Sequence, residues 1–203
     1  MLKLYDSRLS GNAYRVRLVL RRLGLDFERI TLDLAKGEAK TPDFTAKSRF
    51  ARVPTLEFDD GATLVESAAI ILHLAEGTEL LPDDARERSE VTSWLFFEQA
   101  DLMRYLALPR FLTLTGQTEG KEAMIAVLQT MGAQGLDRLE AWLKGHDWLA
   151  LGRVTLADYG VYPYVSVAHQ GGYDMAAYPA IAAWLKRMEA EPGWEPLLPE
   201  GAA

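Results

Sequence analysis

The chain has 203 residues, of which 49% are hydrophobic, with a formal net charge of −7 and no cysteine. This length accommodates one large domain or two small ones, and the composition is typical of a globular protein. Without cysteine there is no disulfide, thiolate metal site or protein thiol nucleophile, so sulfur chemistry needs a thiol supplied by a ligand. The three histidines are scattered along the sequence, which argues against a metal site.

The acidic excess is confined to the second part of the chain. Residues 1–80 hold 12 Lys+Arg and 12 Asp+Glu, which leaves 10 and 17 for residues 81–203. An acidic chain without a basic tract argues against a nucleic-acid partner. No apolar run approaches the ~20 residues that cross a bilayer, and the first residues do not have the layout of a signal peptide. We therefore expect a cytoplasmic protein with no nucleic-acid or membrane partner.

The first 80 residues predict a βαβ unit followed by a ββα unit. Alternating and helix-periodic apolar positions indicate, in chain order, a strand at 2–4, a helix at 13–23, a strand at 27–32, a short helix after 41–42, strands at 53–58 and 62–65, and a helix at 66–75. One parallel crossover and one hairpin give a small mixed sheet.

After a linker-like stretch at 80–84 the strand signals stop. Helical periodicity covers the segments 86–112, 121–144, 155–168 and 179–190. The predicted fold class is therefore α/β plus all-α. It comprises a first domain of residues 1–80 and a helical bundle domain of residues 86–203.

Ser10 and Asn12 lie between the first strand and the first helix, where a helix N-terminus favours an anion. Lowering the pKa of a bound thiol by about two units needs roughly 2.7 kcal/mol. A charge-assisted hydrogen bond contributes ~1.5–3 kcal/mol, and the helix dipole ~0.3–1 kcal/mol. Ser10 would therefore act as a hydrogen-bond donor to a thiolate rather than as a nucleophile. The alternative is that both residues only cap the helix.

Two further segments of the first domain present backbone or side-chain groups to a ligand. Arg52, Val53 and Pro54 open a predicted strand, and proline there can hold a cis peptide bond. The backbone of Val53 could then pair with an extended peptide. Glu66 and Ser67 stand directly before a helix, where Ser67 would bind a carboxylate and Glu66 an ammonium group. The alternative for this pair is a first-turn acid and a helix cap.

These segments together resemble the cytosolic glutathione S-transferases, specifically the bacterial serine-type members. The resemblance runs along essentially the whole chain. The matching stretches are Leu4–Asn12, Lys40–Phe44, Arg52–Leu56, Glu66–Ile70, Trp94–Gln99 and Thr155–Asp158. The third and fourth stretches, at this spacing, carry most of the specificity, and the last matches the family's helix-capping box.

The resemblance implies a thioredoxin-like first domain that binds glutathione as co-substrate, with no metal. Ser10 would activate the glutathione thiol, with Asn12 assisting. Tyr5 is the alternative activator, because other classes of the family use a tyrosine near this point. Its alternation with Leu4 on the first strand favours a structural role for Tyr5 instead.

The resemblance also assigns the rest of the glutathione site. Val53, next to Pro54, would pair with the cysteinyl backbone, and the γ-glutamyl end would meet Glu66 and Ser67. The glycyl carboxylate would meet Lys40 or Arg52.

The sequence departs from the family pattern at two places near the glycyl end. Residues 48–51 read Ser-Arg-Phe-Ala where many relatives have Asn-Pro-x-Gly, and Ala39 stands where a polar glutathione ligand is often found. Two roles are open for Phe50: an aromatic key in a subunit interface, or a core residue.

The second domain would supply the wall of an electrophile pocket. Its candidates are Met103, Tyr105, Arg110 and Phe111, since an apolar surface that contains methionine tolerates varied substrates. Residues at such helical spacing more often belong to the core than to a pocket.

The leading functional prediction is a glutathione transferase of the detoxification type, in which bound thiolate attacks a small apolar electrophile. One alternative is glutathione-dependent reduction of disulfides or peroxides. Another is a non-catalytic glutathione-binding protein, since a fold alone does not prove function. Relatives of this type are usually homodimers, so a homodimer is expected.

Overall fold

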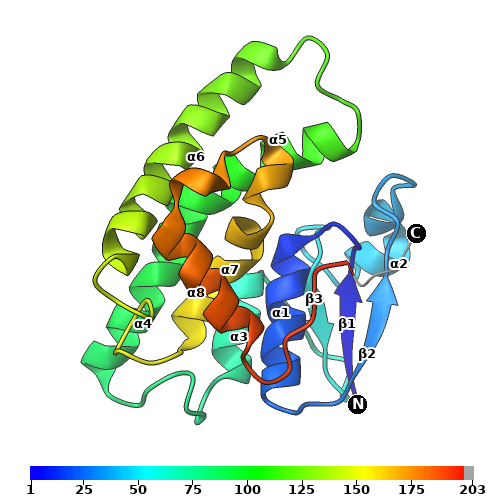
Figure 1. Ribbon diagram of the computed structural model, residues 1–203. Helices are drawn as coiled ribbons and strands as arrows, with labels where there is room; N and C mark the ends of the chain where they lie inside the picture. Colours follow the sequence, from blue (N-terminus) through cyan, green and yellow to red (C-terminus); the bar gives the residue numbers. More distant parts are fainter. Residues whose placement is uncertain (199–203) are drawn as a thin grey trace. The chain divides into compact units, whose positions relative to one another are not determined.

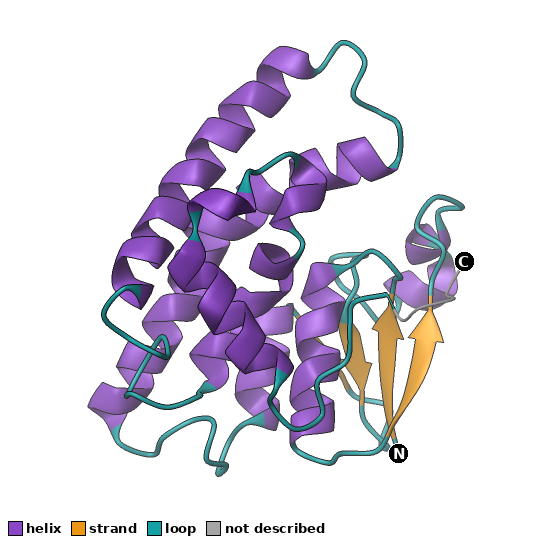
Figure 2. Ribbon diagram, in the orientation of Figure 1, coloured by secondary structure: helices purple, strands orange, loops and turns teal. Residues whose placement is uncertain are grey.

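The computed structural model describes residues 1–198 and divides the chain into two compact units. The first unit is residues 1–76 together with residues 191–198, and the second is Gly77–Ala190. Figure 1 traces the chain by colour, and Figure 2 shows the strands, all of which belong to the first unit. Among the described residues, no helix is long and apolar enough to cross a membrane.

The first unit is built on a four-stranded mixed sheet. Its strands are β1 (Leu2–Asp6), β2 (Phe27–Thr31), β3 (Thr55–Glu57) and β4 (Thr63–Val65). They lie in the order β2-β1-β3-β4, with β1 and β2 parallel and the other neighbours antiparallel. A parallel pair needs a crossover connection, and helix α1 (Gly11–Arg22) provides it. This is the predicted βαβ-ββα arrangement.

The two faces of the sheet are covered by different helices. On one face α1 packs beside α3 (Ser67–Leu74). On the other lie α2 (Pro42–Thr45) and a short 3₁₀ helix, η1 (Glu38–Lys40), which the sequence pattern does not reveal. Alternation along β1 divides its side chains accordingly, since successive side chains point to opposite faces. Leu4 is fully buried, while Tyr5 packs with Ala39 and Phe44 on the η1 and α2 side.

The second unit is all-helical apart from short turns. Its elements are α4 (Ala85–Phe97), the π-helical segment η2 (Glu98–Met103), α5 (Arg104–Leu114), α6 (Glu122–Leu143), α7 (Leu156–Ser166), η3 (Ala168–Gly171), η4 (Met175–Ala177) and α8 (Pro179–Glu189). The single helix predicted at 86–112 is thus a helical run interrupted by a π-helical segment. The α/β plus all-α fold class is confirmed.

The carboxylate of Asp158 links three parts of the helical unit. Asp158 is fully buried in the first turn of α7. Its Oδ2 accepts the Thr155 backbone N–H at 2.9 Å, while Oδ1 accepts the Leu149 N–H at 3.1 Å and the Trp184 indole N–H at 3.0 Å. With Thr155 it forms the reciprocal capping box that the sequence motif indicates. The indole bond ties α8 to the same point.

Residues 191–198 belong to the first unit, whereas the sequence predicts a helical domain of residues 86–203. They pack on α1 within the first unit. A Cβ on Gly193 would lie 2.7 Å from the Arg21 carbonyl carbon, and Gly193 has a φ of +78°. Glycine is therefore required for this close approach. The segment has no regular secondary structure, so no periodicity in the sequence predicts where it docks.

Ala51 closes the turn that begins at Ser48 and has a φ of +51°. A left-handed conformation costs an L-residue about 1–2 kcal/mol, whereas glycine loses about 0.5–1 kcal/mol through its freer unfolded chain. Ala51→Gly should therefore raise the free energy of unfolding by about 0.5–1 kcal/mol in urea denaturation. Ala46→Gly is the matched control, because Ala46 has a φ of −64° and should lose stability instead. Equal losses in both variants would contradict the prediction.

Candidate active site

Strand register brings the three predicted segments of the first unit to one edge of the sheet. Thr55 of β3 pairs with Tyr5 of β1 on one side and with Val65 of β4 on the other. Each segment lies just beyond this row of paired residues. The segments are Ser7–Asn12 after β1, Val53–Pro54 before β3 and Glu66–Ser67 after β4.

Ser10 is the N-cap of α1, as its position in the sequence predicts. Its Oγ accepts the Ala13 backbone N–H at 3.1 Å, and its carbonyl accepts the Tyr14 N–H at 3.0 Å. The residue is half-buried, and the first turn of α1 carries no acidic side chain. Because capping uses a lone pair of the hydroxyl, the O–H proton remains able to donate. A cap and a donor to an anion are therefore compatible roles.

The N-termini of α1 and α3 are joined by a side-chain contact. The Ser67 hydroxyl donates to Asn12 Oδ1 over 3.5 Å, although the two residues are 55 positions apart in the sequence. Ser67 is buried and Asn12 half-buried. Glu66 is exposed, has a φ of +71° and caps α3 through its backbone carbonyl rather than its side chain. The carboxylate of Glu66 therefore makes no capping hydrogen bond.

The peptide bond between Val53 and Pro54 is cis. Val53 is half-buried against the cluster that contains Ala39. Before it, the buried Ser48 hydroxyl donates to the Arg52 carbonyl at 3.0 Å and accepts the Arg52 N–H at 3.2 Å. Ser48 therefore holds this loop through its side chain, which is how the altered 48–51 stretch is accommodated.

The two candidates for the glycyl carboxylate lie on separate loops. Lys40 is exposed at the end of η1, and Arg52 is exposed just before Val53. Phe50 is 50% exposed, with the Arg49 guanidinium 5.0 Å from its ring centroid. Within the isolated chain Phe50 is therefore not a core residue.

Tyr5, the alternative thiol activator, is engaged elsewhere. Its ring is 9% exposed and lies 5.5 Å from the ring of Phe44, and its hydroxyl donates to Glu57 Oε2 at 2.8 Å. Burial, together with the bond to Glu57, raises the pKa of the Tyr5 hydroxyl above its usual value. A raised pKa makes the phenol a poorer donor to a thiolate.

Glu57 carries three donors at the same carboxylate. Lys47 Nζ lies 2.6 Å from Oε2, beside the Tyr5 hydroxyl, and Lys3 Nζ lies 3.3 Å from Oε1. The hydrogen bond from Lys47, followed by that from Tyr5, lowers the pKa of the Glu57 carboxyl from 4.5 to about 2.

A carboxyl whose folded pKa is depressed stabilises the fold above its unfolded pKa and loses that contribution as the pH falls through its folded pKa. The free energy of unfolding should therefore fall between pH 4.5 and about 2. Urea denaturation at a series of pH values measures this slope, and Glu57→Gln should reduce it. Glu28→Gln, at an exposed position of β2, is the control. A wild-type slope in Glu57→Gln would contradict the assignment.

The four pocket candidates of the helical unit differ in exposure. Met103 and Tyr105 are half-buried, and Phe111 is 44% exposed. Arg110 is 3% exposed, and its Nε donates to Gln170 Oε1 at 2.7 Å. Burial lowers the pKa of the Arg110 guanidinium. Arg110 thus ties α5 to η3, while the other three present some surface.

Sequence reasoning missed the polar groups behind the Ser10 turn. Asp6 is fully buried, accepts hydrogen bonds from the Ser7 N–H and Arg29 Nε, and forms an ion pair with Arg17. A signal was present, because an aspartate directly ends an apolar strand and precedes the turn. Its two arginine partners are not recognisable from sequence spacing. Among residues 1–198 there is no group of three or more His, Asp or Glu side chains arranged to hold a metal ion.

A small mixed sheet with helices on both faces, followed by an all-helical unit, defines a two-domain protein with a thioredoxin-like first domain. Comparison with protein families refines this class. The profile of the glutathione S-transferase N-terminal domain matches residues 1–76, and that of the C-terminal domain matches residues 98–192. The chain therefore belongs to the glutathione S-transferase family. The predicted enzyme class, a glutathione S-transferase, is confirmed.

Similar proteins share nearly the full length of the chain. The crystal structure of a glutathione S-transferase from Pseudomonas fluorescens Pf-5 is 37% identical, with a TM-score of 0.94 over 97% of this chain and 98% of that one. Glutathione S-transferase 3 of Zea mays is 35% identical over 96% of this chain and 91% of its own. Protein URE2 of Eremothecium gossypii is 30% identical over 93% of this chain and 65% of its own.

Proposed function

We propose that this enzyme is a serine-type glutathione transferase, in which Ser10 donates a hydrogen bond to the thiolate of bound glutathione. The observation that carries the proposal is the position of the Ser10 hydroxyl. It caps α1 at the sheet edge that also holds Val53–Pro54 and Ser67, and its proton is free to donate. The engagement of the Tyr5 hydroxyl by Glu57 favours Ser10 over Tyr5. Asn12 would assist by orienting the ligand beside Ser67.

The remaining glutathione contacts follow from the same edge. Ser67 would bind the γ-glutamyl carboxylate with its N–H and hydroxyl at the N-terminus of α3, and the exposed Glu66 would meet the ammonium group. The backbone of Val53, beside Pro54, would pair with the cysteinyl residue in the manner of strand addition. Lys40 or Arg52 would meet the glycyl carboxylate, since both are exposed cations close in sequence to the Val53 cluster.

The helical unit would contribute the apolar surface for a small electrophile. Met103, Tyr105 and Phe111 supply partly exposed apolar area, which suits substrates of varied shape. Arg110 would support that surface from the interior of the unit rather than touch the substrate. The proposal includes a cytoplasmic homodimer of the bacterial type with a role in detoxification, and the exposed Phe50 is its candidate interface residue.

The experiment measures glutathione affinity by calorimetry and the conjugation of an aryl halide by absorbance. Wild-type enzyme should both bind glutathione and turn over. Ser67→Ala should raise the Kd for glutathione about tenfold, because a ligand carboxylate then loses a charge-assisted hydrogen bond. Ser93→Ala is the control, since the exposed Ser93 hydroxyl bonds only to its own helix. Absence of glutathione binding by the wild type would refute the proposal.

A non-catalytic glutathione-binding protein is the second candidate. The 30% identity to Protein URE2, a relative that is not named as a transferase, favours it. Binding of glutathione without turnover of aryl halides, disulfides or peroxides would support this candidate. Turnover of disulfides or peroxides alone would instead support glutathione-dependent reduction on the same site.

A further inference from the structure

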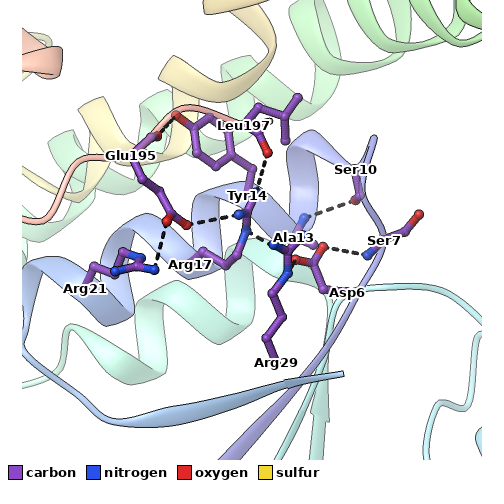
Figure 3. Close-up of polar contacts among 10 residues, drawn as sticks. All are labelled: Asp6, Ser7, Ser10, Ala13, Tyr14, Arg17, Arg21, Arg29, Glu195 and Leu197. Carbon is purple, nitrogen blue, oxygen red and sulfur yellow. Dashed lines mark hydrogen bonds and ion pairs between the residues drawn. The ribbon is translucent and has the colours of Figure 1, made fainter. Parts of the chain in front are cut away.

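A buried ion-pair network adjoins the Ser10 turn and takes no part in the proposed ligand contacts. Its centre is Asp6, the last residue of β1, whose side chain is fully buried. Arg17 of α1 has a side chain only 1% exposed, and Arg29 of β2 one that is 31% exposed. Figure 3 shows these side chains converging beside Ser7 and Ser10. Burying charged groups is costly unless they are paired, so the arrangement needs a reason.

Both carboxylate oxygens of Asp6 are held. Oδ1 accepts the Ser7 backbone N–H at 2.6 Å. Oδ2 accepts Arg29 Nε at 2.6 Å and lies 3.2 Å from Arg17 Nε. Burial raises the pKa of the Asp6 carboxyl, and the two guanidinium groups and the Ser7 N–H oppose that effect. With both oxygens fixed, the carboxylate cannot rotate without breaking a charge-assisted bond.

The Ser7 end of this contact leads directly to Ser10. The Ser7 carbonyl accepts the Ser10 backbone N–H at 3.0 Å, which closes a four-residue turn. Asp6 therefore fixes Ser7, the first residue of the turn. The last residue of the turn is Ser10, whose hydroxyl would donate to the thiolate. The donor's own orientation is set by its bond to the Ala13 N–H in α1.

Arg17 connects the same carboxylate to the helix and to the C-terminal segment. Its η nitrogens donate to Glu195 Oε1 at 3.0 Å and to the Leu197 carbonyl at 3.1 Å. Glu195 also pairs with Arg21 at 2.8 Å, one turn further along α1 (Figure 3). The C-terminal segment thus completes the partners of Arg17, which in turn holds the middle of α1 against the end of β1.

We propose that Asp6 is a positioning residue for Ser10, and that Glu195 supports it by holding Arg17 in place. Asp6 does not touch glutathione in this proposal. It fixes the turn so that the Ser10 hydroxyl points at the sulfur rather than away from it. The inference rests on the proposed role of Ser10 and adds the groups that set its geometry.

Asp6 could affect the bound thiol by positioning Ser10 or by the electrostatic field of its own negative charge. The two effects change the pKa of the thiol in opposite directions when the charge is removed. Removing a nearby negative charge favours a thiolate and by itself lowers the pKa of the bound thiol. Loss of the Ser10 hydrogen bond has the opposite sign, because the donor stabilises the thiolate. A purely structural role predicts lower stability with no change in the thiol. The three roles therefore differ in the direction of one measurement.

The experiment titrates the thiolate absorbance of glutathione bound to the full-length enzyme. In Asp6→Asn we expect the pKa of the bound thiol to rise by about one unit, which is tenfold less thiolate below that pKa. The kcat for conjugation should fall about tenfold at pH 6.5, while the KM for glutathione stays within about twofold. An unchanged or lowered thiol pKa would overturn the proposal.

Glu195→Gln provides a milder test that does not empty the buried network. It removes a negative charge from a partly exposed side chain and weakens the hold on Arg17. We expect the thiol pKa to rise here too, by less than in Asp6→Asn. The matched control is Glu191→Gln, because Glu191 pairs 3.7 Å away with Arg22 of α1 and not with the Asp6 network. An equal response in Glu191→Gln and Glu195→Gln would contradict the proposal.

Failure of this inference is separable from failure of the proposed function. If Ser10→Ala raises the thiol pKa and both Asp6→Asn and Glu195→Gln leave it unchanged, Ser10 is the donor but Asp6 does not position it. If Ser10→Ala leaves the thiol pKa unchanged, the proposed role of Ser10 fails, and the inference fails with it. If the Asp6→Asn variant does not fold, the pKa of the bound thiol in Glu195→Gln decides the test.

Discussion

Replacing Ser10 with alanine should lower kcat/KM for aryl halide conjugation by about 10- to 100-fold. The magnitude follows from the loss of one charge-assisted hydrogen bond to the thiolate, worth about 1.5–3 kcal/mol, at about 1.4 kcal/mol for each factor of ten. The pKa of the bound thiol should rise in the same variant, which its absorbance at a series of pH values measures. Loss of the N-cap should also lower the free energy of unfolding by about 0.5–2 kcal/mol.

Two substitutions separate the donor from the cap. Ser10→Thr keeps both the hydroxyl and the cap and should retain most activity. Ser10→Asp caps the helix as well as serine does, but it brings a negative charge and no proton, so its activity should fall below that of Ser10→Ala. Tyr5→Phe should lower the free energy of unfolding, because the hydrogen bond to Glu57 is lost, and should leave the pKa of the bound thiol unchanged. Loss of thiolate in Tyr5→Phe with normal thiolate in Ser10→Ala would reverse our assignment.

Replacing Asp158 with alanine should lower the free energy of unfolding by about 3–5 kcal/mol, since three buried N–H donors lose their acceptor at once. These donors come from Leu149, Thr155 and Trp184, all of which are fully buried. Each unsatisfied buried donor costs about 1–3 kcal/mol, partly offset by relaxation of the site. Urea denaturation followed by circular dichroism measures the loss.

Smaller changes around Asp158 should have graded effects. Trp184→Phe removes one donor and leaves the carboxylate its backbone partners, so about 1–2 kcal/mol is expected, from the lost hydrogen bond and the smaller ring. Thr155→Ala removes a side-chain cap at 3.3 Å and should cost about 1 kcal/mol. A loss in Asp158→Ala no larger than that in Thr155→Ala would show that the carboxylate does not join the three segments.

Local sequence signals accounted for most of the elements and for the site segments. The alternation in β1, the helical periodicity before Gly24 and the turn signal at Asp59–Gly61 predict their elements because each signal resides in a few neighbouring residues. Ser10 as a helix cap and the Thr155–Asp158 capping box are likewise local. The π-helical segment η2 and the 3₁₀ helix η1 were not predicted, since neither has a periodicity of its own.

Contacts between distant residues were decided by the tertiary structure. The 55-residue separation of Asn12 and Ser67 is closed by the pairing of three strands, which no spacing rule reveals. Whether Tyr5 or Ser10 offers its hydroxyl depends on which face of β1 meets Glu57 and Lys47. A sequence shows that a hydroxyl is present, but packing determines what it bonds to.

The sequence by itself therefore determined the fold class, the family and the segments that we propose as the glutathione site. These follow from periodicity and short motifs, whose physics is confined to one turn or one strand. The tertiary structure alone decided that Arg17 links Asp6, beside the Ser10 turn, to Glu195 of the C-terminal segment. Buried charges select their partners across the whole unit, because in a low-dielectric interior each must find an opposite charge or a hydrogen bond.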